Sequence, residues 1–151
     1  MENVPNLSMA SDGFAAEIGA TEFDQECVTI GNECAAAKMR LDARGPAAYR
    51  VAFTSYCGAK RFPSYFERKW LSLRLSAVKR GMTVDTSVTP RFLAHVTDGR
   101  CPVTLEAFNL TAKSQQNPSV DRLVNEVSYR AGNICVLSMR ANRAKGALSF
   151  E

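Results

Sequence analysis

Basic residues are missing from the first 33 positions of this sequence, which hold seven acidic residues. Lysine and arginine begin at Lys38 and dominate from there to the end. The net charge of +4 is small, so it permits a polyanionic partner without demanding one. We interpret the acidic leader as a solubilising segment. The alternative is that it shields the basic surface or contacts a protein partner.

Long apolar runs are missing too, and the N-terminus lacks the basic start of a secretory signal, so we predict no membrane span and no membrane partner. The five cysteines include no Cys-x-x-Cys pair, which argues against a disulfide framework and against a zinc knuckle. We expect Cys101 and Cys135 to be buried thiols, because a thiol packs as a small hydrophobe. The expected location is the cytoplasm.

The composition, 46% apolar and 23% charged over 151 residues, suits one soluble domain or a domain with an appendage. We predict an α+β fold with a mostly helical N-terminal part followed by a C-terminal ββα module. The expected divisions are an acidic leader with a helical or irregular region over 1–60, a basic helical region over 61–99, and the module over 100–151.

The N-terminal part gives weak signals. The Ala-rich stretch from Phe14 to Met39 predicts one or two short helices with a break near Gly31-Asn32. The stretch from Tyr49 to Cys57 has β-branched and aromatic residues near period two, which predicts a strand. No motif in the first 60 residues indicates a function.

Two helices in the middle of the chain have clear ends. The first begins after Ser64, which with Glu67 has the capping-box spacing, and ends at Gly81. The second begins with Thr89 as its N-cap and Pro90 at its first position, and it stops before Gly99.

The end of the chain has the order strand, turn, strand, helix. We predict short strands over 120–124 and 134–138, a turn around Gly132-Asn133, and a helix from Met139 onward. The chain ends soon after this helix begins, which raises the question of whether it is a fragment of a longer protein.

This order carries the chemistry. Asp121 lies on the first strand and Asn142 on the helix, and their oxygens are hard donors that suit Mg²⁺ or Mn²⁺ better than Zn²⁺. Lys145 follows Asn142 by one helical turn, so both side chains can face the same site.

Three segments between Cys101 and Gly146, CPVT-LEAF, NPSVDRL and YRAGNICVLSMRANRAKG, resemble the HNH family of ββα-metal endonucleases. Phage and bacterial members share a Cys-Pro-x-Thr start, a Ser-x-Asp-Arg-Ile strand, a Gly-Asn-Val turn and an Asn-x-x-Lys helix. The preceding AVKRGMTVDTSVTPRFL is similar to the segment that comes before the module in many of these proteins.

The resemblance implies a role for each matching position. Asp121 and Asn142 would ligate one metal ion, which in such nucleases stabilises the scissile phosphate and the leaving 3′ oxygen. Asn133 would hold the loop in place by backbone hydrogen bonds. Lys145 would contact phosphate.

The family's histidine base, which follows the acid, is replaced by Arg122. Arginine cannot accept a proton at neutral pH, but it can clamp a phosphate. Three explanations are open: another group supplies the base, water serves as the base and cutting is slow, or the module binds nucleic acid or another protein without cutting.

The sole histidine, His95, is interpreted as a partly exposed helix residue. The alternative is that it acts as a surrogate base at the metal site.

Basic residues surround the expected module. We expect Arg140, Arg143 and Lys145 to contact DNA together with Arg122, whereas Arg68, Lys69 and Arg74 are expected to be plain surface.

The leading hypothesis is a small endonuclease, encoded by a phage or mobile element, that hydrolyses phosphodiester bonds in DNA with Mg²⁺ or Mn²⁺. Its site residues would be Asp121, Arg122, Asn133 and Asn142. The alternative is a weakly active or inactive HNH-fold binding protein, such as a phage inhibitor of a host defence system.

Overall fold

The computed structural model describes residues 20–111 and 113–148, so most of the acidic leader lies outside the described residues. Within the described part, the chain has five helices and one antiparallel pair of strands, which confirms an α+β fold. The elements in chain order are α1 (Glu22–Ala36), α2 (Ala47–Ser55), α3 (Tyr65–Val78), α4 (Pro90–Val96), β1 (Pro118–Arg122), β2 (Ile134–Ser138) and α5 (Met139–Lys145).

The helical pair at the N-terminal end corrects two predictions. No break occurs near Gly31, because α1 continues through this residue. The strand predicted over Tyr49–Cys57 is wrong, because this segment forms α2 and buries Tyr49 and Ala52. The two helices pack closely at Gly31, where an added Cβ would lie 2.5 Å from the Tyr49 carbonyl oxygen and 2.9 Å from the Cβ of Ala52. Glycine therefore lets two helix backbones approach closely.

Helix α3 begins and ends as predicted. The Ser64 hydroxyl accepts a hydrogen bond from the Glu67 backbone N–H at 3.2 Å, and Gly81 follows the helix with a φ of 71°. The Glu67 carboxylate does not complete the capping box, because it pairs with Arg61 instead.

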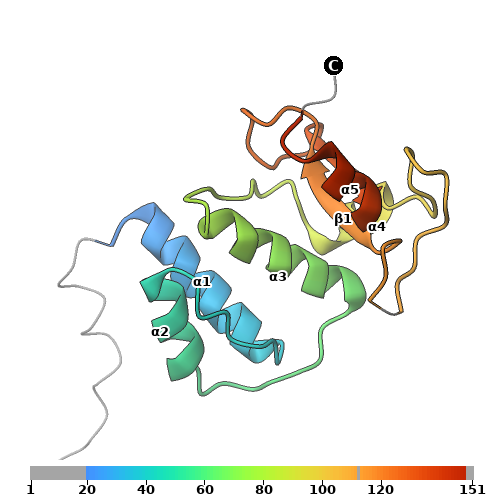
Figure 1. Cartoon of the computed structure of the whole chain (residues 1–151). Coiled ribbons are helices and arrows are strands. Elements are labelled where there is room, and N and C mark those ends of the chain that lie inside the picture. Colours follow the sequence, from blue (N-terminus) through green and yellow to red (C-terminus); the bar gives the residue numbers. More distant parts are fainter. Residues whose placement is uncertain (1–19, 112, 149–151) are drawn as a thin grey trace, which may run out of the picture.

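Helix α3 contributes to two hydrophobic clusters on different sides. Leu71, Leu75 and Val78 pack with α1 and α2. Leu73 and Ala77 pack in a second cluster, which also contains the buried residues Val88, Leu93, Tyr129 and Ile134. Figure 1 shows α3 lying between the α1–α2 pair and the C-terminal strands and helix. Helix α3 therefore packs against the N-terminal helices on one side and against the C-terminal part of the chain on the other.

The C-terminal elements follow the predicted order. Thr89 caps α4 by accepting from the Phe92 backbone N–H at 3.0 Å. Strands β1 and β2 pair with Pro118 opposite Ser138 and Asp121 opposite Cys135, so β1 begins two residues earlier than predicted. A small third cluster of Cys101, Leu137 and Ala141 joins α5 to β2.

Two basic residues of α3 are not plain surface, contrary to the prediction. Arg74 is 7% exposed and forms ion pairs with Glu33 and, at 2.8 Å, with Glu26. The Lys69 ammonium donates to the Pro118 carbonyl oxygen at 2.6 Å. A lysine or arginine side chain can be buried where carboxylate or carbonyl oxygens pair with its charge. Here those oxygens belong to residues more than 40 positions away, so the sequence near α3 does not reveal them.

The described part of the chain has no helix with both the length and the apolar character needed to cross a bilayer. Of the two cysteines expected to be buried, Cys101 is fully buried and Cys135 is half-buried.

Candidate metal and phosphate site

A pocket of about 650 Å³ lies between α3 and the β1–α5 unit. Asp121 and Ser119 reach it from β1, and Asn142 reaches it from α5. Ser119 and Asp121 are two positions apart on the strand, so both side chains point to the same face. The two predicted metal ligands, Asp121 and Asn142, therefore line one pocket.

The Asp121 carboxylate has two close partners. Its Oδ2 pairs with the Lys145 ammonium at 2.8 Å, and its Oδ1 accepts the Arg122 backbone N–H at 2.8 Å. The Lys145 and Asp121 side chains are only 8% and 16% exposed. Lys145 thus contacts the predicted metal-ligating acid itself, and this ion pair is shielded from water.

The Asn142 amide is held in a defined orientation. Its Nδ2 donates to the Ser119 hydroxyl at 2.7 Å. Because the nitrogen makes this bond, the amide oxygen is the atom left to act as an acceptor or as a ligand. Ser119 is therefore a positioning residue for Asn142.

The donor set fits a hard cation with few protein ligands. Mg²⁺ is usually held by one or two carboxylates and completed by water and phosphate, and this pocket offers the Asp121 carboxylate with amide and hydroxyl oxygens nearby. In residues 20–111 and 113–148, no three His, Cys, Asp or Glu side chains gather as a metal-binding group. A metal here would therefore depend on Asp121 and Asn142 and on its substrate.

Asn133 is buried and holds the loop between the strands. Its Oδ1 accepts the Val124 backbone N–H at 2.9 Å. Its Nδ2 donates to the carbonyl oxygens of Val124 at 3.0 Å, Val127 at 3.1 Å and Ser128 at 3.1 Å. One side chain thus fixes the loop that leaves the strand bearing Asp121.

Arg122 is not among the residues that line the pocket. Its guanidinium stacks over the Tyr129 ring with 5.0 Å to the centroid, and it approaches the Val127 carbonyl oxygen at 3.4 Å. Alternation along β1 sends this side chain to the face opposite Asp121.

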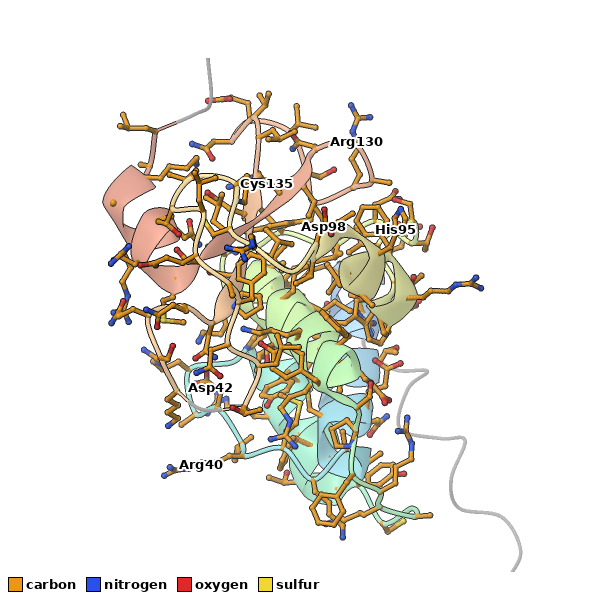
Figure 2. The ribbon with its side chains drawn as sticks, turned by 90° about the vertical axis from the view of Figure 1, so that its right-hand side faces the viewer. Arg40, Asp42, His95, Asp98, Arg130 and Cys135 are labelled. Carbon is orange, nitrogen blue, oxygen red and sulfur yellow. The ribbon has the colours of Figure 1, made fainter. Side chains whose placement is uncertain are left out.

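The remaining predicted DNA contacts and the histidine lie elsewhere. Arg140 pairs with Glu106 at 2.9 Å, and Arg143 is exposed near Gln115. His95 is exposed in the last turn of α4, and it does not line the pocket that holds Asp121. In Figure 2, His95 lies on the opposite side of the view from α5.

The thiol opposite Asp121 has a raised pKa. Cys135 faces Asp121 across the strand pair, and burial together with the nearby Asp121 charge raises the pKa of this thiol to about 11. At Cys101, burial opposes ionisation, but hydrogen bonds involving Ser138 and Thr104 lower its pKa to about 6.

Ser119, Arg80 and Tyr129 line the pocket but were not among the site residues predicted from the sequence. Ser119 could have been found from its spacing of two from Asp121 on a strand. Arg80 and Tyr129 also line the pocket, where the Arg80 Nη2 donates to the Tyr129 hydroxyl at 2.8 Å. No local pattern joins them, because they are 49 residues apart.

Comparison of the chain with protein-family models, curated proteins and solved structures finds no match.

Proposed function

We propose that this protein is a metal-dependent endonuclease of the HNH type that hydrolyses phosphodiester bonds in DNA. The observation that carries the proposal is that Asp121 of β1 and Asn142 of α5 line one pocket beside a strand–loop–strand–helix unit. The hydrogen bonds that Asn133 makes to its loop are of the kind that the resemblance implies, and they support the same proposal.

Asp121 and Asn142 would hold Mg²⁺ or Mn²⁺, which when bound supplies charge stabilisation to the scissile phosphate and the leaving oxygen. The chain's own residues orient this site. Ser119 fixes the Asn142 amide, and the Arg122 backbone N–H fixes one Asp121 oxygen. Lys145 lies within reach of an anionic group brought to Asp121.

Proton transfer has no obvious side-chain base. The described residues that line the pocket include no histidine, and Asp121 is their one carboxylate. The Arg122 guanidinium stacks over the Tyr129 ring, is not among the residues that line the pocket, and cannot accept a proton. A missing base typically costs about 10²–10⁴ in rate, so we expect slow cutting.

The test is nicking of supercoiled plasmid by the full chain with Mn²⁺, with Mg²⁺ and with a chelator. The parent should nick slowly and only with metal. Asp121→Ala and Asn142→Ala should each lower the rate by at least about a hundredfold, because each removes one of two protein ligands. Circular dichroism and the melting temperature check the fold, and Asp121→Asn serves if the alanine variant does not fold.

The matched control is Glu126→Ala, which removes an exposed carboxylate five residues beyond Asp121. It should nick like the parent. Parent-like nicking by folded Asp121→Ala would contradict the assigned site. A parent that never nicks with metal would contradict the endonuclease.

Two observations favour a second candidate, a non-cutting binding protein such as a phage inhibitor of a host defence nuclease. The Lys145 ammonium already neutralises Asp121 at 2.8 Å, and arginine stands in place of the base. This candidate requires no metal-dependent nicking and a stable complex with a protein partner, so the plasmid assay with a pull-down separates the two.

A further inference from the structure

The cations of α3 and its C-terminal end fall into two groups according to their partners. Arg74 and Lys79 are neutralised by acids of the N-terminal part: Arg74 pairs with Glu26 and Glu33, and Lys79, although it also lines the pocket that holds Asp121, pairs with Asp42 at 2.6 Å. Arg68, Lys69 and Arg80 form no ion pair with any carboxylate in the described residues.

The cations of the second group contact neutral oxygens or solvent. Lys69 donates to the Pro118 carbonyl oxygen at 2.6 Å. Arg80 donates to the Ser76 carbonyl oxygen at 3.0 Å and to the Tyr129 hydroxyl at 2.8 Å, which orient its guanidinium without cancelling its charge. Arg68 is exposed. An oriented cation that keeps its charge is suited to bind an anion.

All three cations line one groove. Arg80 and Lys69 line the pocket that holds Asp121 and Asn142. Arg68 and Lys69 line an adjoining pocket of about 580 Å³, which shares Lys69 and Ser72 with the first. Across both linings, Asp121 is the one acid among the described residues. Net positive charge along a groove raises the local concentration of a polyanion.

The length of the groove suits a nucleic-acid strand. Lys69 and Arg80 are 11 positions apart, which at about 1.5 Å per residue is roughly 16 Å along the helix direction. A B-form strand places a phosphate about every 3.4 Å along its axis, so several phosphates pass between these cations. Each pocket has a volume typical of a small-ligand site, about 300–1,000 Å³. This spacing and this volume are compatible with a single strand lying along α3.

We propose that this groove along α3 binds the phosphate backbone of one DNA strand, with Arg68 and Arg80 contacting phosphates on either side of the Asp121 site. The inference rests on the proposed function, because it assigns the route by which that substrate would reach the site. It gives the phosphate-contacting role to Arg68 of α3 and to Arg80, which follows α3, in place of Arg122.

The test measures binding of the full chain to a fluorescent single-stranded oligo-dT by anisotropy, in chelator, over a series of KCl concentrations. Arg68→Ala and Arg80→Ala should each weaken binding severalfold. Each should also make the slope of log K against log[KCl] shallower by about 0.7, the value for one lost phosphate contact on a single strand. A purely structural role would not change this slope.

The matched controls are Arg91→Ala on α4 and Arg50→Ala on α2, which remove exposed arginines that line neither pocket. They should keep the parent slope, and Arg80→Lys should restore part of it. Melting temperatures identify any variant that has lost its fold. If one groove variant does not fold, the slope measured for the other one tests the proposal.

Three results would overturn the inference: parent slopes in both groove variants, equal losses in the controls, or no binding of the oligonucleotide by the parent at low salt. The proposed function fails separately. If binding depends on Arg68 and Arg80 but the parent never nicks plasmid, the groove proposal is supported and the endonuclease proposal is wrong. If the parent nicks plasmid with metal while both groove variants keep the parent slope, the endonuclease proposal is supported and the groove proposal is wrong.

Discussion

The Lys145 ammonium lies 2.8 Å from Asp121 in a setting that is almost closed to water. A metal cation at Asp121 would compete with this ammonium for the same carboxylate, because both are attracted to one negative charge. Lys145 is therefore placed to oppose metal binding at Asp121 and to interact with an anion that arrives there.

Replacing Lys145 with methionine tests this competition. The metal-free Lys145→Met protein should lose about 3 kcal/mol of stability, because a mostly buried carboxylate loses its counter-charge. Addition of Mn²⁺ should then raise the melting temperature more than it does in the parent. The measurement is the melting temperature with and without Mn²⁺.

Arg143→Met on the same helix is the control, since Arg143 is exposed and does not contact Asp121. It should show the Mn²⁺ response of the parent. An equal response in the Lys145 variant would show that the lysine does not compete with metal.

For single residues, the sequence indicates which residue types are present and which face of a strand each side chain occupies. It does not indicate which side chains contact one another. The order of Asp121, Asn133 and Asn142 on strand, loop and helix predicts which of them could meet. The pairing of Asp121 with Lys145 has no sequence signature, because it depends on how α5 packs on β1. Ser119 was recoverable from strand alternation alone.

The contact between α1 and α2 depends on one missing side chain. Gly31 lies mid-helix, where alanine normally stabilises by roughly 0.5–1 kcal/mol relative to glycine. Here an added Cβ would lie 2.5 Å from the Tyr49 carbonyl oxygen. We expect Gly31→Ala to destabilise the protein by about 1–3 kcal/mol, the usual cost of overpacking, as measured by urea unfolding.

Val28→Ala provides the comparison, because Val28 is 41% exposed on the same helix. It should change stability by no more than about 0.5 kcal/mol. A stabilised Gly31→Ala protein would mean that α1 and α2 do not approach as closely as described.

Elements with local end signals were predictable, and those set by tertiary packing were not. Ser64 and Thr89 each accept the backbone hydrogen bond that their sequence context predicts. The segment of α2 carries β-branched and aromatic residues that suit a strand, but it forms a helix that buries Tyr49 in the core with residues of α1 and α3. Period-two and helical patterns are difficult to separate over nine residues.

Electrostatic contacts tie the N-terminal helices to the rest of the molecule. Asp42, in the α1–α2 connection, pairs with Lys79 at 2.6 Å, and Figure 2 shows it in the loop below the C-terminal elements. The Lys79 ammonium, with the Arg44 backbone N–H, lowers the pKa of Asp42 from 3.8 to about 2.

Because this pKa is depressed, the contribution of Asp42 to stability is complete above about pH 4 and is lost as the pH falls towards 2. The melting temperature of Asp42→Asn should lie below that of the parent from pH 5 to 8, and the difference should shrink between about pH 4 and 2. A difference that is constant over that range would contradict the pair.

Helix α3 belongs equally to two cores, since Leu71 and Val78 pack under α1 and α2 while Leu73 and Ala77 pack toward α4 and β2. The C-terminal unit therefore cannot be transplanted into another protein by cutting before α3. A graft that begins there would carry an uncovered apolar stripe and would lack the acids that neutralise Arg74. Any host for this unit would have to supply its own substitute for the first two helices.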